Sequence, residues 1–429
     1  MIDILPFLVL GILLVLNAPV TLCLSLAALA FFLTGPGVPV QVFIQRMVSA
    51  TESFPLLAIP FFILAGVVMN HAGITSRIMG LADTFVGHMI GGLARVNVLL
   101  STMMGGMSGS ANADAAMQST ILVPEMTARG YDKAFSAAVT AFSAIITAII
   151  PPSIGLILFG YLADVSIGRL FIAGLVPGAL ICILLLFVVG RVSRAQGYPP
   201  SRQTRATWGE KGHALADAGW GLMIPVGILG GIRFGWYTPT EAGAIAVVYA
   251  LFIGGVIYRA LDLRKIPAMF VEAAIATSVI MLIICAASAF GFFLSWEMLP
   301  AKLSTAMLAL SQNPMLILLL INVLLILVGT ILEGGAALII LTPLFVPVIT
   351  PLGIDPVHFG IVMVLNLTIA GVTPPVGTLM YTTCSITGVS VGDFTRKALP
   401  LFGAMIVALL LVTFVPALSL WLPALVYGS

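Results

Sequence analysis

Charged residues are scarce in this chain of 429 amino acids: Asp, Glu, Lys and Arg make up only 8% of it, against about 25% in a typical soluble domain. Hydrophobic residues make up 60% of the sequence, and long apolar stretches recur along its whole length. The short alternating segments of a membrane β-barrel are absent. The composition therefore excludes a soluble globular protein. It predicts an all-α polytopic membrane protein with on the order of ten to twelve crossings, since each crossing needs about 20 apolar residues.

Further absences exclude several kinds of site. The four cysteines lie in or beside apolar stretches without C-x-x-C spacing, so we expect small core residues rather than disulfides or a metal site. The sequence contains no phosphate-binding loop of the G-x-x-x-x-G-K type, so ATP is not indicated as the energy source. The histidines flank predicted loops or helix ends, and we assign them to the membrane interface. They are His71, His88, His213 and His358.

The few basic residues are concentrated in one polar stretch. Between Arg191 and Lys211, five Lys or Arg residues accompany a single acid, Glu210. Short loops rich in Lys and Arg face the cytoplasm. The stretch also contains Gly and Pro, so we predict a cytoplasmic linker over residues 201–218. The apolar N-terminal run lacks a basic n-region and is predicted to be a retained helix rather than a signal peptide.

Residues 1–200 and 219–429 repeat one another. Matched positions are separated by 219 to 224 residues throughout, which is hard to obtain by chance. The matches are Pro19 with Pro239, Glu52 with Glu272, Pro124 with Pro343, Pro151-Pro152 with Pro374-Pro375, and Ser166 with Ser390. Internal repeats characterise many secondary transporters, whose substrate site lies where the repeats meet. We therefore predict two membrane repeats, and expect their topology to be inverted.

One pair of matched segments interrupts apolar sequence with small residues. Residues 105–114 and 328–335 are rich in glycine, which lets a backbone leave helical geometry. Non-helical backbone at membrane depth is tolerated only where it is buried in protein or lines a cavity. We predict re-entrant helical hairpins over about 98–126 and 314–350, with tips inside the membrane.

A second pair contains two prolines in series, within residues 147–153 and 370–377. Proline removes a backbone donor and restricts the preceding residue, so each pair predicts a broken helix, over about 134–163 and 357–386. Freed carbonyls and hydroxyls in such a break can ligate Na⁺, and helix N-termini opposite them can hold an anion.

Asp114 and its counterpart Glu333 are acids in the two predicted hairpin tips. Small residues alone usually indicate close helix packing. A carboxylate at the bilayer centre, however, costs at least about 3 kcal/mol and is normally functional. The matched acids therefore favour a functional site at the tips.

Two other functions, an intramembrane protease and a channel, compete with a carrier. Residues 106–109 fit G-x-S-G, which resembles the serine motif of rhomboid intramembrane proteases, but no histidine lies inside an apolar stretch to act as the base. A channel commonly builds one filter by oligomeric symmetry. Two different interrupted pairs within one chain suit a carrier better, so we predict a secondary transporter and not an enzyme.

Six motifs resemble the large membrane (M) subunit of tripartite ATP-independent periplasmic (TRAP) transporters. They are residues 59–66 (IPFFILAG), 108–114 (SGSANAD), 150–153 (IPPS), 239–242 (PTEA), 353–360 (GIDPVHFG) and 373–377 (TPPVG). The resemblance runs essentially from end to end. It implies an elevator-type ion-transporter fold with re-entrant hairpins and Pro-Pro broken helices, in which a transport domain slides against a scaffold.

The resemblance also implies function and partners. It implies sodium-coupled import of an organic acid, such as a C4-dicarboxylate, sialic acid or another sugar acid, across the bacterial inner membrane. The partners would be a small four-helix membrane subunit (Q type) as a separate chain and a periplasmic substrate-binding protein (P type).

Two sodium sites and a substrate site are implied by the same resemblance. The first sodium site would use Ser108 or Ser110 with backbone around Thr147, Ile150 and Ser153, and the second Gly329 with Ala370, Thr373 and Val376. The substrate would contact Asn112, Asp114, Ser153 and Ser166. Because the second tip lacks the serines of the first, we expect the second sodium site to use mainly backbone oxygens.

Overall fold

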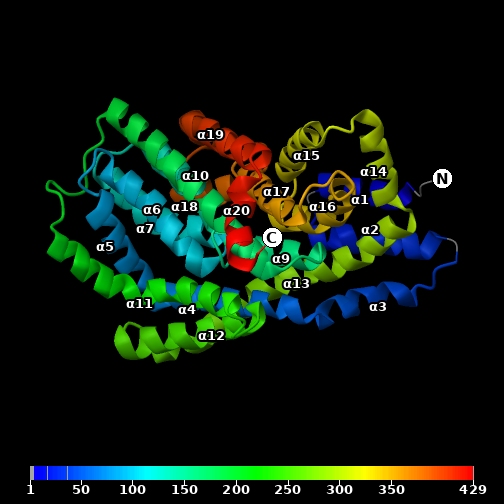
Figure 1. Cartoon of the computed structure of the whole chain (residues 1–429), viewed down its shortest axis with the longest axis horizontal. Helices are drawn as coiled ribbons and strands as arrows, with labels where there is room; N and C mark the ends of the chain where they lie inside the picture. Colours follow the sequence, from blue (N-terminus) through cyan, green and yellow to red (C-terminus); the bar gives the residue numbers. More distant parts are fainter. Residues whose placement is uncertain (1–3, 17, 36, 429) are drawn as a thin grey trace.

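The computed structural model describes residues 4–16, 18–35 and 37–428, and every regular element in these ranges is a helix (Figure 1). The molecule is elongated. Helices α3, α4, α11, α12 and α13 line its lower edge in Figure 1, and α9, α17 and α20 lie near its middle. The predicted all-α class is confirmed.

The helices of the first half are α1 (Leu5–Val15), α2 (Val20–Thr34), α3 (Gln41–Ser49), α4 (Ala58–His71), α5 (Ile74–Val86), α6 (Gly92–Ser108), α7 (Ala111–Ala128), α8 (Lys133–Ile149), α9 (Ile154–Leu162) and α10 (Ile167–Gln196). The helices of the second half are α11 (Trp208–Arg233), α12 (Pro239–Phe252), α13 (Ile266–Trp296), α14 (Leu299–Leu310), α15 (Pro314–Gly329), α16 (Gly334–Ile349), α17 (Pro356–Ala370), α18 (Thr378–Thr387), α19 (Val391–Phe414) and α20 (Ala417–Tyr427).

The described helices include six that are long and apolar enough to cross a membrane, or seven if α8 and α9, which are bent by 44°, count as one span. This is fewer than the predicted ten to twelve crossings. The difference arises because several apolar stretches are divided by breaks into helices of 10–17 residues.

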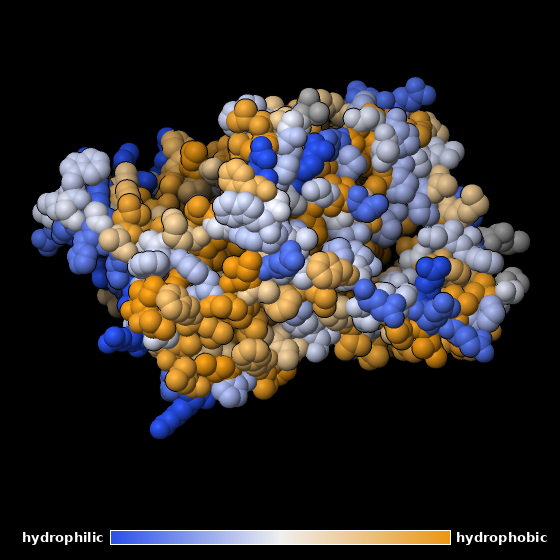
Figure 2. Space-filling model, turned by 60° about the horizontal axis from the view of Figure 1, so that its bottom comes forward, coloured by the Kyte–Doolittle hydropathy of each residue, from blue (hydrophilic) through white to orange (hydrophobic). Residues whose placement is uncertain are grey.

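Apolar side chains cover much of the outer surface. Figure 2 shows broad hydrophobic areas on one face, with hydrophilic residues in smaller groups between and around them. Val248 on α12 is 67% exposed, and Ile275 on α13 is 62% exposed. Contiguous apolar surface of this extent suits contact with lipid rather than with water.

The helix breaks follow from local sequence. Between α6 and α7, Gly109 adopts a left-handed backbone with φ of +60°, and the Ser110 hydroxyl accepts a hydrogen bond from Ala113 N. Between α15 and α16, the Glu333 carboxylate accepts one from Ala336 N at 3.0 Å. Side-chain oxygens at these positions satisfy amides that a helix start leaves without a partner.

The two halves interlock through equivalent helices. Helix α7 of the first hairpin packs against α18, and α16 of the second hairpin packs against α9. Helix α2 is the equivalent of α12, and α4 is the equivalent of part of α13. Here too each half contacts the other, because α12 packs against α4 and α2 packs against α13. The Pro-Pro bonds at 151–152 and 374–375 are both cis. The exchange of contacts brings both hairpin tips and both Pro-Pro breaks into one region.

Between α10 and α11, residues 197–207 lie outside helices, and the predicted linker of residues 201–218 overlaps this segment. Helix α11 begins at Trp208 because Thr207 and Glu210 form a reciprocal capping box, which stabilises a helix start.

One histidine is buried in protein. His358 lies in the first turn of α17 and is 2% exposed. Its ring nitrogens contact Ser419 Oγ at 2.6 Å and the Thr413 carbonyl at 3.2 Å. Hydrogen bonds on both sides of the ring allow the imidazole to be buried.

Tyr131 anchors the linker. Its hydroxyl donates to the Pro199 carbonyl at 2.6 Å, and its ring stacks on Tyr198 with the centroids 4.6 Å apart. Burial raises the pKa of Tyr131 to about 12, so the phenol stays protonated and keeps donating at neutral pH.

We expect Tyr131→Phe to loosen the linker while leaving the fold intact. Loss of one hydrogen bond of about 1 kcal/mol increases the population of the open linker about fivefold. Limited trypsin cleavage after the exposed Arg205 should accelerate by that factor. Tyr249→Phe is the matched control, because it removes a hydroxyl that donates to Trp220 O at 3.2 Å, away from the linker. Equal cleavage rates in both variants would contradict the anchoring role.

Candidate functional site

A cavity of about 490 Å³ lies where the hairpins and the broken helices meet. Its size is typical of a small-molecule site. Its walls come from both hairpin tips, from the Pro-Pro breaks, from the start of α2 and from the middle of α13. Polar lining residues include Thr21, Ser110, Asn112, Glu333, Thr368 and Thr378. We refer to this space as the central cavity.

Each hairpin tip is hydrogen-bonded to the break beside it. The Gly109 carbonyl accepts from Ile154 N at 3.2 Å, and the Thr330 carbonyl accepts from Val376 N at 3.0 Å. These two backbone bonds occupy matching places in the two halves. They position each tip against its broken helix.

The first predicted sodium site combines a free hydroxyl with closely packed backbone. Ser108 Oγ is buried and has no hydrogen-bond partner among the described residues. A Cβ added to Gly109 would lie 2.6 Å from the Pro152 carbonyl oxygen, so only glycine lets the tip approach the break this closely. Ile150 follows the last turn of α8 and packs against Gly105. The Ser108 hydroxyl is thus a free oxygen beside the break, whereas the hydroxyls of Ser110 and Thr147 are hydrogen-bonded.

The second predicted sodium site is built mainly from backbone. Gly329 packs so closely on Ala370 that an added Cβ would lie 2.6 Å from the alanine Cβ. In the break, the carbonyl oxygens of Thr373 and Gly371 converge 2.8 and 2.9 Å from the position of a Cβ on Gly377. The Thr373 hydroxyl donates to Ile369 O instead. The Gly371 carbonyl also accepts from Leu379 N at 2.9 Å and from Met380 N at 3.2 Å.

Asp114 lies behind the tip rather than in the central cavity. It is 1% exposed, and its carboxylate accepts from Ser101 Oγ at 2.8 Å and Gln118 Nε2 at 2.7 Å. Thr147 Oγ1 lies 2.9 Å from Asp114 Oδ2. Since Asp114 follows Asn112 by two helical residues, the two side chains point about 200° apart around α7. The carboxylate therefore ties α6, α7 and α8 together.

The predicted substrate residues are separated in the structure. Asn112 lines the central cavity, whereas Ser153 is buried at the start of α9 and accepts from Leu156 N. Ser166 caps α10 and lines a different cavity, beside Tyr237. The structure thus places Asn112 and Ser166 at different cavities, and Asp114 lines neither of the two.

Several cavity residues carry no sequence signal. Val20 at the start of α2 and Ile283 on α13 line the central cavity as ordinary apolar residues. Two buried amides outside the predicted sites, in contrast, can be recognised from the sequence. Asn97 donates to Thr140 Oγ1 at 2.7 Å, and Asn322 donates to Thr413 Oγ1 at 2.9 Å, each from within an apolar helix. A lone amide in an apolar run indicates such a buried pair.

A cavity enclosed by helical hairpins and broken helices in an apolar bundle is typical of membrane transport proteins. The family model for the DctM component of tripartite ATP-independent periplasmic transporters matches residues 7–418. The chain therefore belongs to this family, as the large membrane subunit. It is a multi-pass protein of the inner membrane. The family consists of transporter permeases rather than enzymes.

Relatives of this chain are named for different substrates. It is 39% identical to the sialic acid TRAP transporter large permease protein SiaM of Vibrio cholerae, over 96% of each chain. It is 38% identical to the isethionate TRAP transporter permease protein DctMQ of Oleidesulfovibrio alaskensis, over 95% of this chain and 64% of the relative. Identity is also 38% with the C4-dicarboxylate TRAP transporter large permease protein DctM of Pseudomonas aeruginosa, over 88% of each.

Two solved transporters have a similar fold. The YdaH transporter of Alcanivorax borkumensis matches with a TM-score of 0.59, over 97% of this chain and all of that chain. MtrF of Neisseria gonorrhoeae matches with a TM-score of 0.58, over 95% and 94%. Each is only 14% identical, so the likeness concerns the fold.

We expect Asp114→Asn to destabilise the first hairpin. Ser101, Gln118 and Thr147 all direct donors at this side chain, and an amide brings a donor of its own, so at least one buried group loses its partner. The cost of about 1–3 kcal/mol should lower the melting temperature of the purified protein by several degrees.

Glu333→Gln is the control for Asp114→Asn, since its amide oxygen can still accept from Ala336 N. A melting temperature that is equally unchanged in both variants would contradict the structural role of Asp114.

Proposed function

We propose that this chain is the substrate-translocating subunit of a sodium-coupled, binding-protein-dependent importer of an organic acid. The observation that supports it most directly is the polarity of the helix ends around the central cavity. The first residues of five helices line it: Val20, Ala111, Ile154, Gly334 and Thr378. Helix N-termini carry a partial positive charge and free amide groups.

This arrangement explains how an anion can be bound without a basic side chain. Among the described residues that line the central cavity, none is Lys or Arg, and the single charged one is Glu333. Attraction for a carboxylate must therefore come from the helix ends and from polar groups such as the Asn112 amide. The Glu333 carboxylate is available to the hydroxyls of a hydroxylated acid.

The opposite helix ends support the two cation sites. Helices α6 and α8 end at Ser108 and Ile149, beside the first tip, and α15 and α17 end at Gly329 and Ala370, beside the second. C-terminal turns carry partial negative charge and unpaired carbonyls. Sodium bound there would neutralise these ends and favour the packing of each tip on its break. Cation binding would thereby stabilise the substrate cavity, which is a physical basis for coupling.

Inverted repeats and an elevator movement fit the same arrangement. Tyr198, just after the end of α10, stacks on Tyr131, and Lys397 near the start of α19 lies 3.4 Å from Asp132. The matched helices α10 and α19 thus have opposite ends beside one loop, which supports opposite directions through the membrane. The hairpins and broken helices would form the moving unit, and α2 and α13, on the other wall of the cavity, the scaffold.

Partners are proposed from the family. A small four-helix membrane subunit in a separate chain would complete the scaffold, and a periplasmic binding protein would deliver the acid. The sialic acid, isethionate and C4-dicarboxylate relatives all carry small organic anions by their names. An organic acid is therefore the proposed substrate class.

The proposal is tested by uptake into liposomes that contain this chain, its small subunit and its binding protein. Radiolabelled sialic acid, isethionate and succinate serve as probes. We expect one of them to accumulate when sodium is higher outside, because a tenfold sodium gradient supplies about 1.4 kcal/mol for each ion that enters. Uptake that ignores the sodium gradient would refute the coupling, and no uptake of any probe would refute the substrate class.

A second experiment targets the backbone cation site. Gly377→Ala places a methyl group within 3 Å of the Thr373 and Gly371 carbonyl oxygens. We expect the sodium concentration for half-maximal uptake to rise about tenfold, as a loss of about 1.4 kcal/mol would cause.

Gly403→Ala in α19 is the matched control for Gly377→Ala, because no atom lies within 4 Å of its added Cβ. An unchanged sodium dependence in Gly377→Ala would remove this break from the cation site.

A further inference from the structure

A second cavity, of about 500 Å³, lies at the far end of α13 from the basic residues that precede this helix. Arg259, Arg264 and Lys265 lie before the start of α13, and basic loops face the cytoplasm. The opposite end of α13, at Trp296, therefore faces the external side. Residues of α3, α9, α13 and α16 line the second cavity, which we call the external cavity.

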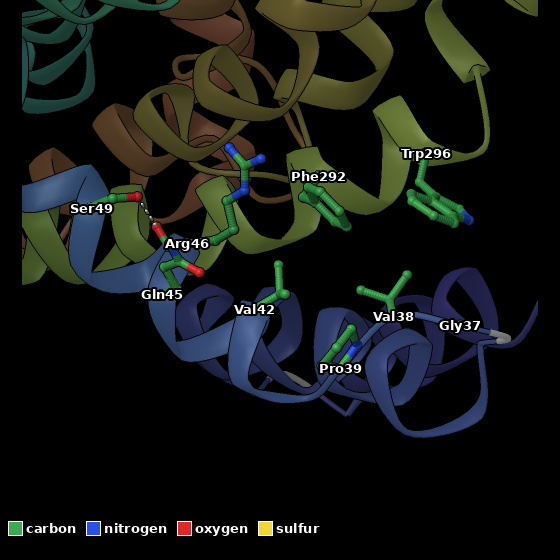
Figure 3. Close-up of a pocket in the computed structure, with 9 residues that line it drawn as sticks. All are labelled: Gly37, Val38, Pro39, Val42, Gln45, Arg46, Ser49, Phe292 and Trp296. Carbon is green, nitrogen blue, oxygen red and sulfur yellow. Dashed lines mark hydrogen bonds between the residues drawn. The ribbon is translucent and has the colours of Figure 1, made fainter.

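Arg46 on α3 supplies the external cavity with positive charge. Its guanidinium lies 4.8 Å from the centre of the Phe292 ring, and among the described residues no carboxylate forms an ion pair with it. Figure 3 shows its side chain extending away from Gln45, alongside Phe292 of α13. Arg46, Phe292 and Trp296 also border an adjoining groove of about 520 Å³, which lies between α3 and α13. An unpaired guanidinium at a cavity is well suited to bind a carboxylate.

The external cavity lies next to the central cavity along one face of α13. Val279, Ile280 and Ile283 line the central cavity, and Ile284, Ala287, Ser288 and Gly291 line the external one. These positions recur at the three- and four-residue intervals of a single helix face. Ile339 of α16 lines both cavities. The two spaces are thus neighbours along one helix, separated at Ile339.

The chemistry of the external cavity differs from that of the central one. Its wall combines the Arg46 guanidinium with the hydroxyl-bearing residues Tyr161, Ser288 and Ser295. In the central cavity, by contrast, the attraction for an anion comes from the N-terminal ends of helices. A full charge near the surface acts over a longer range than partial charges at depth.

We propose that Arg46 and the external cavity form a second binding site, which holds the carboxylate of the incoming acid before it enters the central cavity. This inference rests on the proposed function, since it requires an anionic substrate arriving from outside. Arg46 would bind the carboxylate, and the hydroxyls of the wall would contact the rest of the acid.

The test uses the complete complex in liposomes, with the probe among sialic acid, isethionate and succinate that the wild-type complex takes up. For Arg46→Gln, we expect the uptake rate at saturating loaded binding protein to fall about tenfold, as for loss of one charge-assisted hydrogen bond. Arg46→Lys should retain most of the rate. Lys302→Gln is the matched control, because this exposed lysine near the same end of α13 lies 3.8 Å from Glu297.

The salt dependence of the uptake rate distinguishes an electrostatic role of Arg46 from a purely structural one. Choline chloride at about 1 M shortens the Debye length to about 3 Å. We expect it to slow the wild-type complex several-fold and to leave Arg46→Gln nearly unaffected. Equal salt sensitivity in the two would overturn the proposal.

Other roles of Arg46 give different outcomes. An unchanged maximal rate in Arg46→Gln overturns the inference. If only the concentration of binding protein for half-maximal uptake rises, Arg46 docks the protein and not the acid. If native mass spectrometry shows a lost phospholipid while the rate is unchanged, Arg46 holds a lipid phosphate. Both of these results overturn the proposal. A wild-type complex that transports none of the probes refutes the proposed function itself.

Discussion

A helix that ends within a membrane leaves backbone donors and acceptors that no water can satisfy, and the structure around the central cavity depends on how these groups are paired. Ile154 N donates to Gly109 O, and Val376 N donates to Thr330 O. Each bond joins a hairpin tip to the break beside it. A tip that moved alone would expose both partners at a cost of several kcal/mol. Tip and break are therefore expected to move as one unit, and this unit occurs in both halves.

The same breaks determine where charge can be bound. Breaking a helix creates a new C-terminus and a new N-terminus a few residues apart, with opposite partial charges. In this chain the new N-termini line the central cavity, whereas the new C-termini meet beside it, at Ser108 and Gly329. In the proposed function, an anion and two cations would therefore be held close together with few ionised side chains. This agrees with the low charge content of the sequence, because each ionised group buried in a membrane is costly.

Buried polar contacts reinforce this arrangement at matching places. Ser143 donates to Asn97 at 2.7 Å, and Asn366 donates to Asn322 at 2.9 Å, so each hairpin is joined to the first part of its broken helix by an amide. Among the described residues, only the first half includes a carboxylate, that of Asp114, in these buried contacts. In the second half the matching acid, Glu333, instead caps α16 and lines the central cavity. The halves share a framework but differ in where the acid points, which gives one cavity two chemically different walls.

Much of the site could be predicted from local sequence. Prolines in series break a helix wherever they occur, so Pro151-Pro152 and Pro374-Pro375 marked both breaks, and the glycine-rich tips marked both hairpins. The direction of individual side chains could not be predicted in the same way. Asp114 and Asn112 lie two residues apart in one motif, yet only Asn112 faces the central cavity, because their orientation depends on which side of α7 meets α8.

The amino-acid sequence by itself determined the class of the protein, its helical content, the position of its breaks and its family, because composition, proline and glycine act locally. Tertiary structure alone decided which groups share a space. The central cavity joins α2, α7, α9, α13, α16 and α18, which are distant in the sequence. The apolar residues of α13 carry no signal that they line a cavity, and Arg46 none that it lies beside Phe292. Such contacts exist only once the two halves pack against each other.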